Sequence, residues 1–188
     1  MRILSIVCVL LALAGCQKSE PAPQANETAA SADAGEIKGV HRDNKGKTAP
    51  AVEFNDPDGK TTSLAAFAGK PTLVNLWATW CAPCVKELPT LDRLSKADSG
   101  NLNVVAVSQD FGPRASVVAF LQSNKIVNLD PYQDPKMALS TALGAPVLPT
   151  SVLFDANGKE VWRYVGDLDW TSAEAAKLLA EGGVSPPR

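Results

Sequence analysis

WATWCAPCVKELP, residues 77–89, sets two cysteines, Cys81 and Cys84, between an apolar run and a helical pattern. The run at residues 73–77 predicts a buried strand, and the pattern over residues 83–96 predicts a helix. The two cysteines therefore follow the carboxyl end of a strand, where open α/β sheets place their chemistry.

Short β-rich runs and helical patterns alternate on both sides of this stretch. Further strands are predicted at residues 51–54, 60–62, 103–108, 126–129, 150–155 and 159–165, and further helices at residues 63–67, 114–123, 135–143 and 171–181. Ala-Asn-Gly at residues 156–158 favours a hairpin, and Pro89 is expected to kink its helix. This order predicts an α/β fold with a central mixed sheet flanked by helices.

The composition argues against an electrostatic function. The chain has 188 residues, 18 Lys and Arg against 20 Asp and Glu, and a formal charge of −2. A surface that binds nucleic acid would be strongly basic, so no nucleic-acid partner is expected. With 45% hydrophobic residues, the chain can build one core without support from disulfides.

Residues 1–15 have the pattern of a signal peptide. One positive charge at Arg2 precedes an apolar run at residues 3–14, which is shorter than the roughly 20 residues of a membrane-spanning helix. Leu-Ala-Gly-Cys at residues 13–16 resembles the lipobox of bacterial lipoproteins, which implies cleavage before Cys16 and acyl chains on that cysteine. The alternative is an ordinary signal peptide with a chance cysteine.

Residues 16–47 are predicted to be the lipidated cysteine and a disordered tether, because this segment has almost no bulky apolar side chain. The only histidine, His41, is expected there as a solvated linker residue. One globular domain follows over residues 48–183, and residues 184–188 form a tail.

Three kinds of chemistry are open to the cysteine pair. Cys8 leaves with the signal peptide, so a metal would find only Cys81, Cys84 and the distant His41, too few ligands for a zinc site. A purely structural disulfide would close a short loop and stabilise little. Redox exchange fits better, and Cu(I) held by the two thiolates remains the alternative.

Each position in the pair suits disulfide exchange. At the N-terminus of a helix, Cys81 meets orphan amide groups and the positive end of the helix dipole, which favour its thiolate and make it the nucleophile. Cys84 lies one turn along and resolves the mixed disulfide. Pro83 stiffens the first turn. Because neither Ala82 nor Pro83 carries a charge, the sequence predicts a reductant, and an oxidant that installs disulfides is the alternative.

Two segments carry a family resemblance: GKTAPAVEFNDPDGKTTSLAAFAGKPTLVNLWATWCAPCVKELP, residues 46–89, and LPTSVLFDANGKEV, residues 148–161. Together they resemble the TlpA/ResA-like thiol-disulfide oxidoreductases of the thioredoxin superfamily, and the start of the first also resembles peroxiredoxins of the AhpC/TSA type. The resemblance covers residues 47–181. It implies a thioredoxin-like fold with an N-terminal β-hairpin extension, and a redox-active Cys81–Cys84 disulfide that needs no cofactor and no metal.

The resemblance also implies residues that bind the substrate chain. Pro149 matches the family's cis-proline, which faces the cysteine pair and docks the substrate, and Leu148 and Thr150 lie beside it. Trp80 and Pro83 are expected to contact the substrate, with Trp80 shielding the disulfide.

A proton carrier is implied as well. Glu87 matches a glutamate that accepts or relays the proton of Cys84, whereas its alternative is an ordinary solvent-facing helix residue. Asn75 stands where cytoplasmic thioredoxins have a buried aspartate, which strengthens the case for Glu87. Trp77 and Trp170 are expected only to pack.

The predicted protein is a membrane-anchored, extracytoplasmic enzyme that reduces protein disulfides. The resemblance implies a periplasmic location, a membrane thiol electron donor of the DsbD/CcdA type, and substrates such as apocytochrome c or copper-site proteins of oxidase assembly. Gln17 after the lipidated cysteine leaves inner and outer membrane open. A Cu(I) chaperone and a peroxidase are the competing functions.

Overall fold

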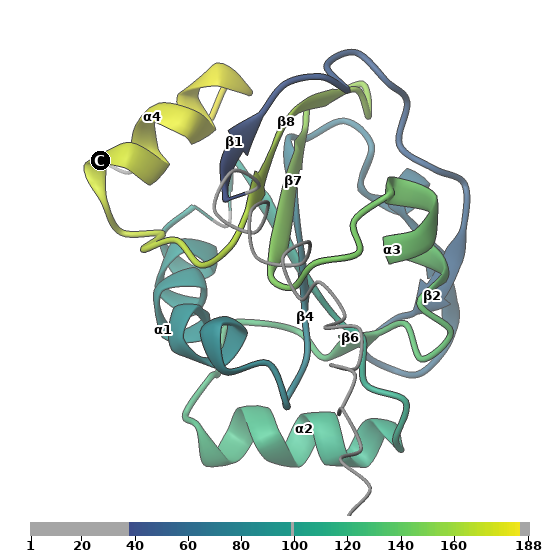
Figure 1. Ribbon diagram of the computed structural model, residues 1–188. Coiled ribbons are helices and arrows are strands. Elements are labelled where there is room, and N and C mark those ends of the chain that lie inside the picture. Colours follow the sequence, from purple (N-terminus) through teal and green to yellow (C-terminus); the bar gives the residue numbers. More distant parts are fainter. Residues whose placement is uncertain (1–37, 99, 185–188) are drawn as a thin grey trace, which may run out of the picture. The chain divides into compact units, whose positions relative to one another are not determined.

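The computed structural model describes residues 38–98 and 100–184. The predicted signal peptide, Cys8, the lipidation site Cys16 and most of the tether lie outside the described residues. An eight-stranded mixed sheet forms the centre of the domain, in the order β1-β8-β7-β4-β5-β6-β2-β3 (Figure 1).

The helices and strands alternate along the chain much as predicted. The strands are β1 (Gly39–His41), β2 (Glu53–Asn55), β3 (Thr61–Ser63), β4 (Thr72–Trp77), β5 (Asn103–Ser108), β6 (Tyr132–Gln133), β7 (Thr150–Phe154) and β8 (Glu160–Val165). The helices are η1 (Leu64–Phe67, a 3-10 turn), α1 (Ala82–Ala97), α2 (Arg114–Ser123), α3 (Ala138–Leu143) and α4 (Ala173–Glu181). Among the helices within the described ranges, none is both long and apolar enough to cross a bilayer.

Strand β4 is the centre of the sheet, and all six of its residues are buried. It pairs in parallel with β5, where Leu73 lies opposite Val104, and antiparallel with β7, where Leu73 lies opposite Leu153. A strand covered on both faces needs the nearly continuous apolar run that the sequence shows. Because β4 ends at Trp77, the cysteine motif emerges at one end of the sheet.

Side chains alternate between two cores on opposite faces of the sheet. On one face, Leu73 and Trp77 pack with apolar residues of α1, α2 and α4, and the Trp77 ring lies 5.8 Å from that of Phe120. On the other face, Val74 and Leu76 pack with residues of α3, η1 and β2. The predicted mixed sheet with helices on both faces is confirmed, and α3 lies across the sheet from α1 and α4 (Figure 1).

The predicted end of the tether at residue 47 is wrong. Strand β1 pairs antiparallel with β8, with Gly39 opposite Val165, and the amide of Gly46 donates to the carbonyl of Glu160 at 2.7 Å. His41 therefore lies in a strand and not in a linker. Backbone pairing at the edge of a sheet needs no bulky apolar side chain, so the composition of this segment could not reveal the strand.

Other elements also differ from the prediction: the strand expected at residues 126–129 is absent, β6 was not predicted, and the helix expected from residue 135 begins at Ala138. The strand expected at residues 126–129 is irregular because Asp92 of α1 takes its backbone donors, accepting the amides of Val127 at 2.9 Å and Asn128 at 2.6 Å. Val184, predicted as the start of the tail, is buried and belongs to the core.

The predicted hairpins are both present. Strands β2 and β3 pair antiparallel and extend the sheet beyond β6, as the N-terminal extension was expected to do. Strands β7 and β8 are joined through Asp155, whose side chain accepts the amides of Asn157 and Lys159, and Gly158 takes a positive φ of 70°. The antiparallel pairing of β7 with β4 places the start of β7, Thr150, opposite Leu76 near the cysteine motif.

Candidate active site

The cysteine pair lies where the chain passes from β4 into α1. Cys81 is the N-cap residue of α1, and its Sγ accepts a hydrogen bond from the amide of Cys84 at 3.3 Å. The two sulfurs form a disulfide, with the Cα atoms 5.3 Å apart. Cys81 is 6% exposed and Cys84 is 0% exposed. Cys81 is therefore the sulfur that a partner can reach, and its position at the cap suits a thiolate.

A buried carboxylate fixes the loop in front of the pair. Asp110, just past β5, accepts the amide of Thr79 at 3.1 Å and the hydroxyl of Thr79 at 2.6 Å. Ser108 also donates to it at 2.7 Å. Asp110 thus ties the end of β4 to the end of β5, a role that sequence reasoning missed because residues 79 and 110 meet only through the parallel pairing of these strands.

The loop before β7 reaches the same end of the sheet. Thr150 lies opposite Leu76 near the end of β4, and the Leu148–Pro149 peptide bond is cis, as the resemblance implied. Leu148 is half-buried between the two cores. The side chain of Thr150 is buried, and its hydroxyl donates to the carbonyl of Val147 at 2.7 Å, so a substrate contact at this position would use its backbone. Thr150 shapes the loop from within.

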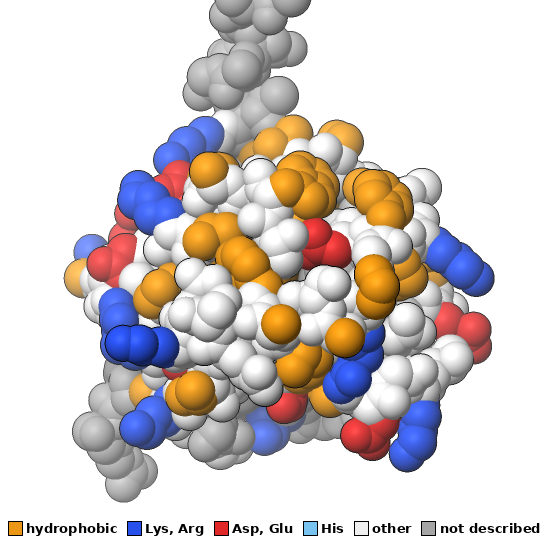
Figure 2. Space-filling view, turned by 90° about the horizontal axis from the view of Figure 1, so that it is seen from below, with side chains coloured by type: hydrophobic (Ala, Val, Ile, Leu, Met, Phe, Trp, Pro, Cys, Tyr) orange, Lys and Arg blue, Asp and Glu red, His pale blue; other side chains and the backbone are white. Residues whose placement is uncertain are grey.

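Large apolar side chains are exposed around this end. Trp80 is 63% exposed, Phe111 70% and Val147 41%. These three residues, called the apolar rim below, follow β4, follow β5 and precede β7, so the topology brings them to one end of the sheet. Pro83 is exposed beside them on α1. The end of the domain that carries α2 shows hydrophobic side chains across its middle and most charged ones toward its margin (Figure 2).

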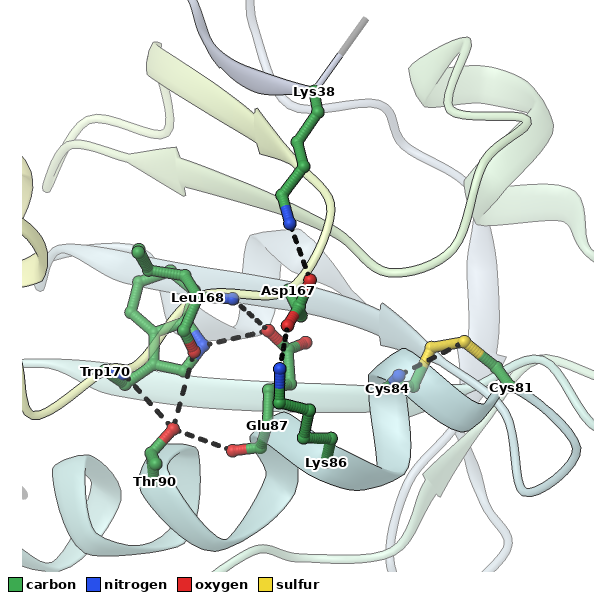
Figure 3. Close-up of polar contacts among 9 residues, drawn as sticks. All are labelled: Lys38, Cys81, Cys84, Lys86, Glu87, Thr90, Asp167, Leu168 and Trp170. Carbon is green, nitrogen blue, oxygen red and sulfur yellow. Dashed lines mark hydrogen bonds and ion pairs between the residues drawn. A yellow bond between two sulfur atoms is a disulfide. The ribbon is translucent and has the colours of Figure 1, made fainter. Parts of the chain in front are cut away.

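Glu87 lies one helical turn beyond Cys84 and is 2% exposed, so its alternative as a solvent-facing residue is wrong. Figure 3 shows its carboxylate turned toward the loop after β8. The amide of Leu168 donates to it at 3.1 Å and the indole of Trp170 at 3.4 Å. Burial raises the pKa of Glu87 to about 7, although hydrogen bonds from Asn75, Leu168 and Trp170 counteract part of that rise.

Two partners of Glu87 show what the sequence could and could not reveal. Asn75, fully buried in β4, donates to Glu87 at 2.7 Å and to Ser151 at 2.9 Å. An asparagine within an apolar strand is unusual, and this was the sequence signal that Asn75 has a polar partner in the core. Trp170 was expected only to pack, and it lies 83 residues away in sequence, so nothing before the fold could join it to Glu87.

The arrangement can exchange disulfides at the Cys81–Cys84 pair. Within residues 38–98 and 100–184, no cluster of three or more His, Cys, Asp or Glu side chains is placed to hold a metal ion. The described site consists of the Cys81–Cys84 disulfide and, one turn further along α1, the carboxyl group of Glu87 with a pKa of about 7.

The sequence is similar to those of known proteins. The sequence model of the Redoxin family matches residues 44–179. The chain belongs to the Redoxin family. Thiol-disulfide oxidoreductase ResA of Bacillus thuringiensis is 32% identical over 123 residues, which is 65% of this chain and 70% of that protein. Thiol:disulfide interchange protein DsbE of Vibrio cholerae is 31% identical over 144 residues, which is 72% of this chain and 76% of that protein.

Solved structures agree with these sequence matches. The crystal structure of the exposed lipoprotein thioredoxin of Streptococcus pneumoniae has a TM-score of 0.58 and 26% identity, covering 69% of this chain and 98% of that one. The fold of this Redoxin is thus thioredoxin-like, and the protein is a thiol-disulfide oxidoreductase.

Proposed function

We propose that this protein is a membrane-anchored, extracytoplasmic enzyme that reduces disulfides in protein substrates. The observation that carries the proposal is the asymmetry of the pair: Cys81 is the reachable cap sulfur, while Cys84 is buried one turn from Glu87. By resemblance, the substrates are apocytochrome c or copper-site proteins of oxidase assembly, and electrons come from a membrane dithiol donor.

The proposed reaction has two exchange steps. The Cys81 thiolate attacks a substrate disulfide, forming a mixed disulfide while the other substrate sulfur leaves as a thiolate. Cys84 then passes its proton to the Glu87 carboxylate and attacks Cys81 Sγ, which releases the second substrate thiolate and closes the Cys81–Cys84 disulfide. The substrate gains two electrons, and the membrane donor returns two to the enzyme by the reverse exchange.

The surroundings of the pair favour a reductant. A strong oxidant is one whose reduced thiolate form is stabilised by its neighbours. Apart from the cap itself, the described contacts provide little of this: Ala82 and Pro83 are uncharged, and the ammonium of Lys86 pairs with Asp167 at 3.0 Å. An ionised Glu87 beneath Cys84 opposes a second negative charge there. Both effects favour the disulfide over the dithiol.

The reduction potential tests the direction of electron flow. A full chain carrying Cys8→Ser and Cys16→Ser, in detergent, leaves only Cys81 and Cys84 to titrate in graded thiol-disulfide buffers. We expect a potential at or below the range of roughly −200 to −270 mV found for glutaredoxins and thioredoxin. A value near about −120 mV, typical of a periplasmic oxidant, would make this an enzyme that installs disulfides.

The proposed membrane anchor is a lipid on Cys16. The lipobox at residues 13–16 supports it, and one structural relative is named an exposed lipoprotein. Labelled palmitate should enter the full chain expressed in bacteria and should not enter a Cys16→Ala variant. Equal labelling of both chains would contradict the lipid anchor and would leave the proposed redox role of Cys81 unaffected.

The apolar rim is proposed to bind the substrate chain. We expect Phe111→Ala to raise KM for insulin disulfides about 3- to 10-fold, because a largely exposed aromatic ring can only gain contact area by binding a protein. Reduction of the Cys81–Cys84 disulfide by dithiothreitol should be unchanged. The matched control is Val127→Ala, which removes a 78% exposed side chain from the loop held by Asp92. Equal KM values for both variants would exclude Phe111 from the substrate surface.

A further inference from the structure

The loop between β8 and α4 covers Glu87. Residues 166–170 of this loop, called the strap below, provide the Leu168 amide and the Trp170 indole that donate to the Glu87 carboxylate. The strap is also tied to the helix beneath, since the amide of Trp170 donates to the hydroxyl of Thr90 at 3.1 Å. Leu168 is 7% exposed and Trp170 3%, so together they close the carboxylate off from water.

One carboxylate on the strap joins it to two other segments. Asp167 accepts the ammonium of Lys38 on one oxygen at 2.8 Å and that of Lys86 on the other at 3.0 Å. Lys38 directly precedes β1, and Lys86 directly precedes Glu87 on α1. Figure 3 shows the two lysines converging on Asp167 from opposite sides. These ion pairs hold the pKa of Asp167 down at about 2.

The first residue of the strap, Gly166, leaves room for Lys38 to reach Asp167. The amide of Gly166 donates to the carbonyl of Pro149 at 2.9 Å. Gly166 has a φ of 97°, and a Cβ atom there would lie 3.0 Å from the side chain of Lys38. A glycine lets the chain turn away from β8 while Lys38 passes over it to reach Asp167.

We propose that Asp167, bridged by Lys38 and Lys86, is a positioning residue that keeps the strap closed over the Glu87 carboxylate. The effect reaches the chemistry through Glu87, so this inference rests on the proposed proton transfer from Cys84. Asp167 touches neither sulfur in any described contact. Its work is to exclude water from the group that receives the proton.

The charges around Glu87 allow the strap to be separated from a simple field effect. Asp167 on the strap and Tyr164 on β8 interact electrostatically with Glu87, and the ammonium groups of Lys38 and Lys86 pair with Asp167. If these groups acted on Glu87 only through their charges, loss of the two lysines would raise its pKa further, because positive charge favours a carboxylate. Opening of the strap lowers the pKa, because burial is the largest cause of the rise and outweighs the hydrogen bonds that opening breaks.

The test is a carboxyl NMR titration of Glu87 in the oxidised full chain, where Cys81 and Cys84 do not titrate, with its resonance assigned through Glu87→Gln. We expect Lys38→Gln/Lys86→Gln to lower the pKa of Glu87 from about 7 toward the ordinary value of 4.5. Amide exchange at Leu168 should rise about tenfold, as expected for the loss of weak, partly exposed ion pairs. A pKa that rises or stays unchanged overturns the proposal.

Two further variants test whether the effect comes from the ion pairs of the strap. Lys60→Gln/Lys136→Gln makes the same change of net charge on exposed side chains away from the strap, and it should leave both readouts unchanged. Asp167→Asn keeps the size of the side chain and should speed exchange at Leu168; its Glu87 pKa does not discriminate, because losing the Asp167 charge alone would lower it. If the double lysine variant does not fold, Lys86→Gln alone must show faster Leu168 exchange, and its absence contradicts the proposal. Because these readouts do not use catalysis, they stand apart from any failure of Glu87 in exchange.

Discussion

Cys84→Ser accumulates a mixed disulfide between Cys81 and a substrate chain. The reason is geometric: Cys81 caps the helix N-terminus and is the more exposed of the two sulfurs, and within residues 38–98 and 100–184 the only other thiol is that of Cys84, 5.3 Å away between Cα atoms. The adduct should appear by mass spectrometry after the reduced variant meets insulin, and turnover should fall to background.

Cys81→Ser, in contrast, forms almost no mixed disulfide, because the sulfur that attacks the substrate is missing. Cys84 is fully buried, so a substrate disulfide cannot reach it, and we expect at least about 1,000-fold less adduct than with Cys84→Ser. Both variants carry Cys8→Ser and Cys16→Ser so that no other thiol can react. Comparable trapping through Cys84 would reverse the assigned roles.

Glu87→Gln slows insulin reduction about 10- to 100-fold at neutral pH. Glutamine keeps the size of the side chain but cannot accept a proton from Cys84, so the resolving step loses its base. In the unchanged protein, the rate should rise as pH passes through about 7, the pKa of Glu87. The variant should lack that inflection. An identical pH-rate profile in both proteins would remove Glu87 from the mechanism.

Unfolding of the oxidised protein gives an independent control for the same group. Below pH 4.5, Glu87 is protonated in both the folded and the unfolded state, so it does not change the free energy of unfolding with pH. As pH rises toward about 7, the unfolded chain releases the proton and the folded one does not, which favours unfolding. The free energy of unfolding should therefore fall by roughly 2 to 4 kcal/mol between pH 4.5 and 8. Glu87→Gln should lack this decline.

Much of the fold was predictable from local patterns because its central elements are locally consistent. The run at residues 73–77 is apolar because β4 is covered on both faces, and the N-terminus of α1 is set by Cys81 and Pro83. The prediction failed at β1, which is held by backbone pairing with β8 and, in apolar contact with the core, by Val40 alone of its three residues. It failed again at residues 126–129, where the backbone amides donate to the side chain of Asp92, distant in sequence, and not to a neighbouring strand.

The candidate site divides in the same way. Cys81, Cys84, Glu87 and Pro149 could be named from the sequence because they stand in or near short motifs. Their supports could not be named, because each acts across a long separation in the chain: Asp110 on Thr79, Trp170 on Glu87, and Asp167 on Lys38. A motif can therefore indicate the reacting atoms, while the groups that set their environment appear only when strands and loops are brought together.

Strand β1 also sets where the folded domain begins. A protein that begins at residue 48 would lack β1, leave the outer edge of β8 open to pair with another chain, and lose the Lys38 ion pair to Asp167. A cut just ahead of Lys38 would keep every strand and helix of the described domain. With the lipid anchor proposed at Cys16, cleavage there would release a domain with all these elements, whereas cleavage ten residues later would release one with an unpaired edge at β8 and no Lys38–Asp167 ion pair.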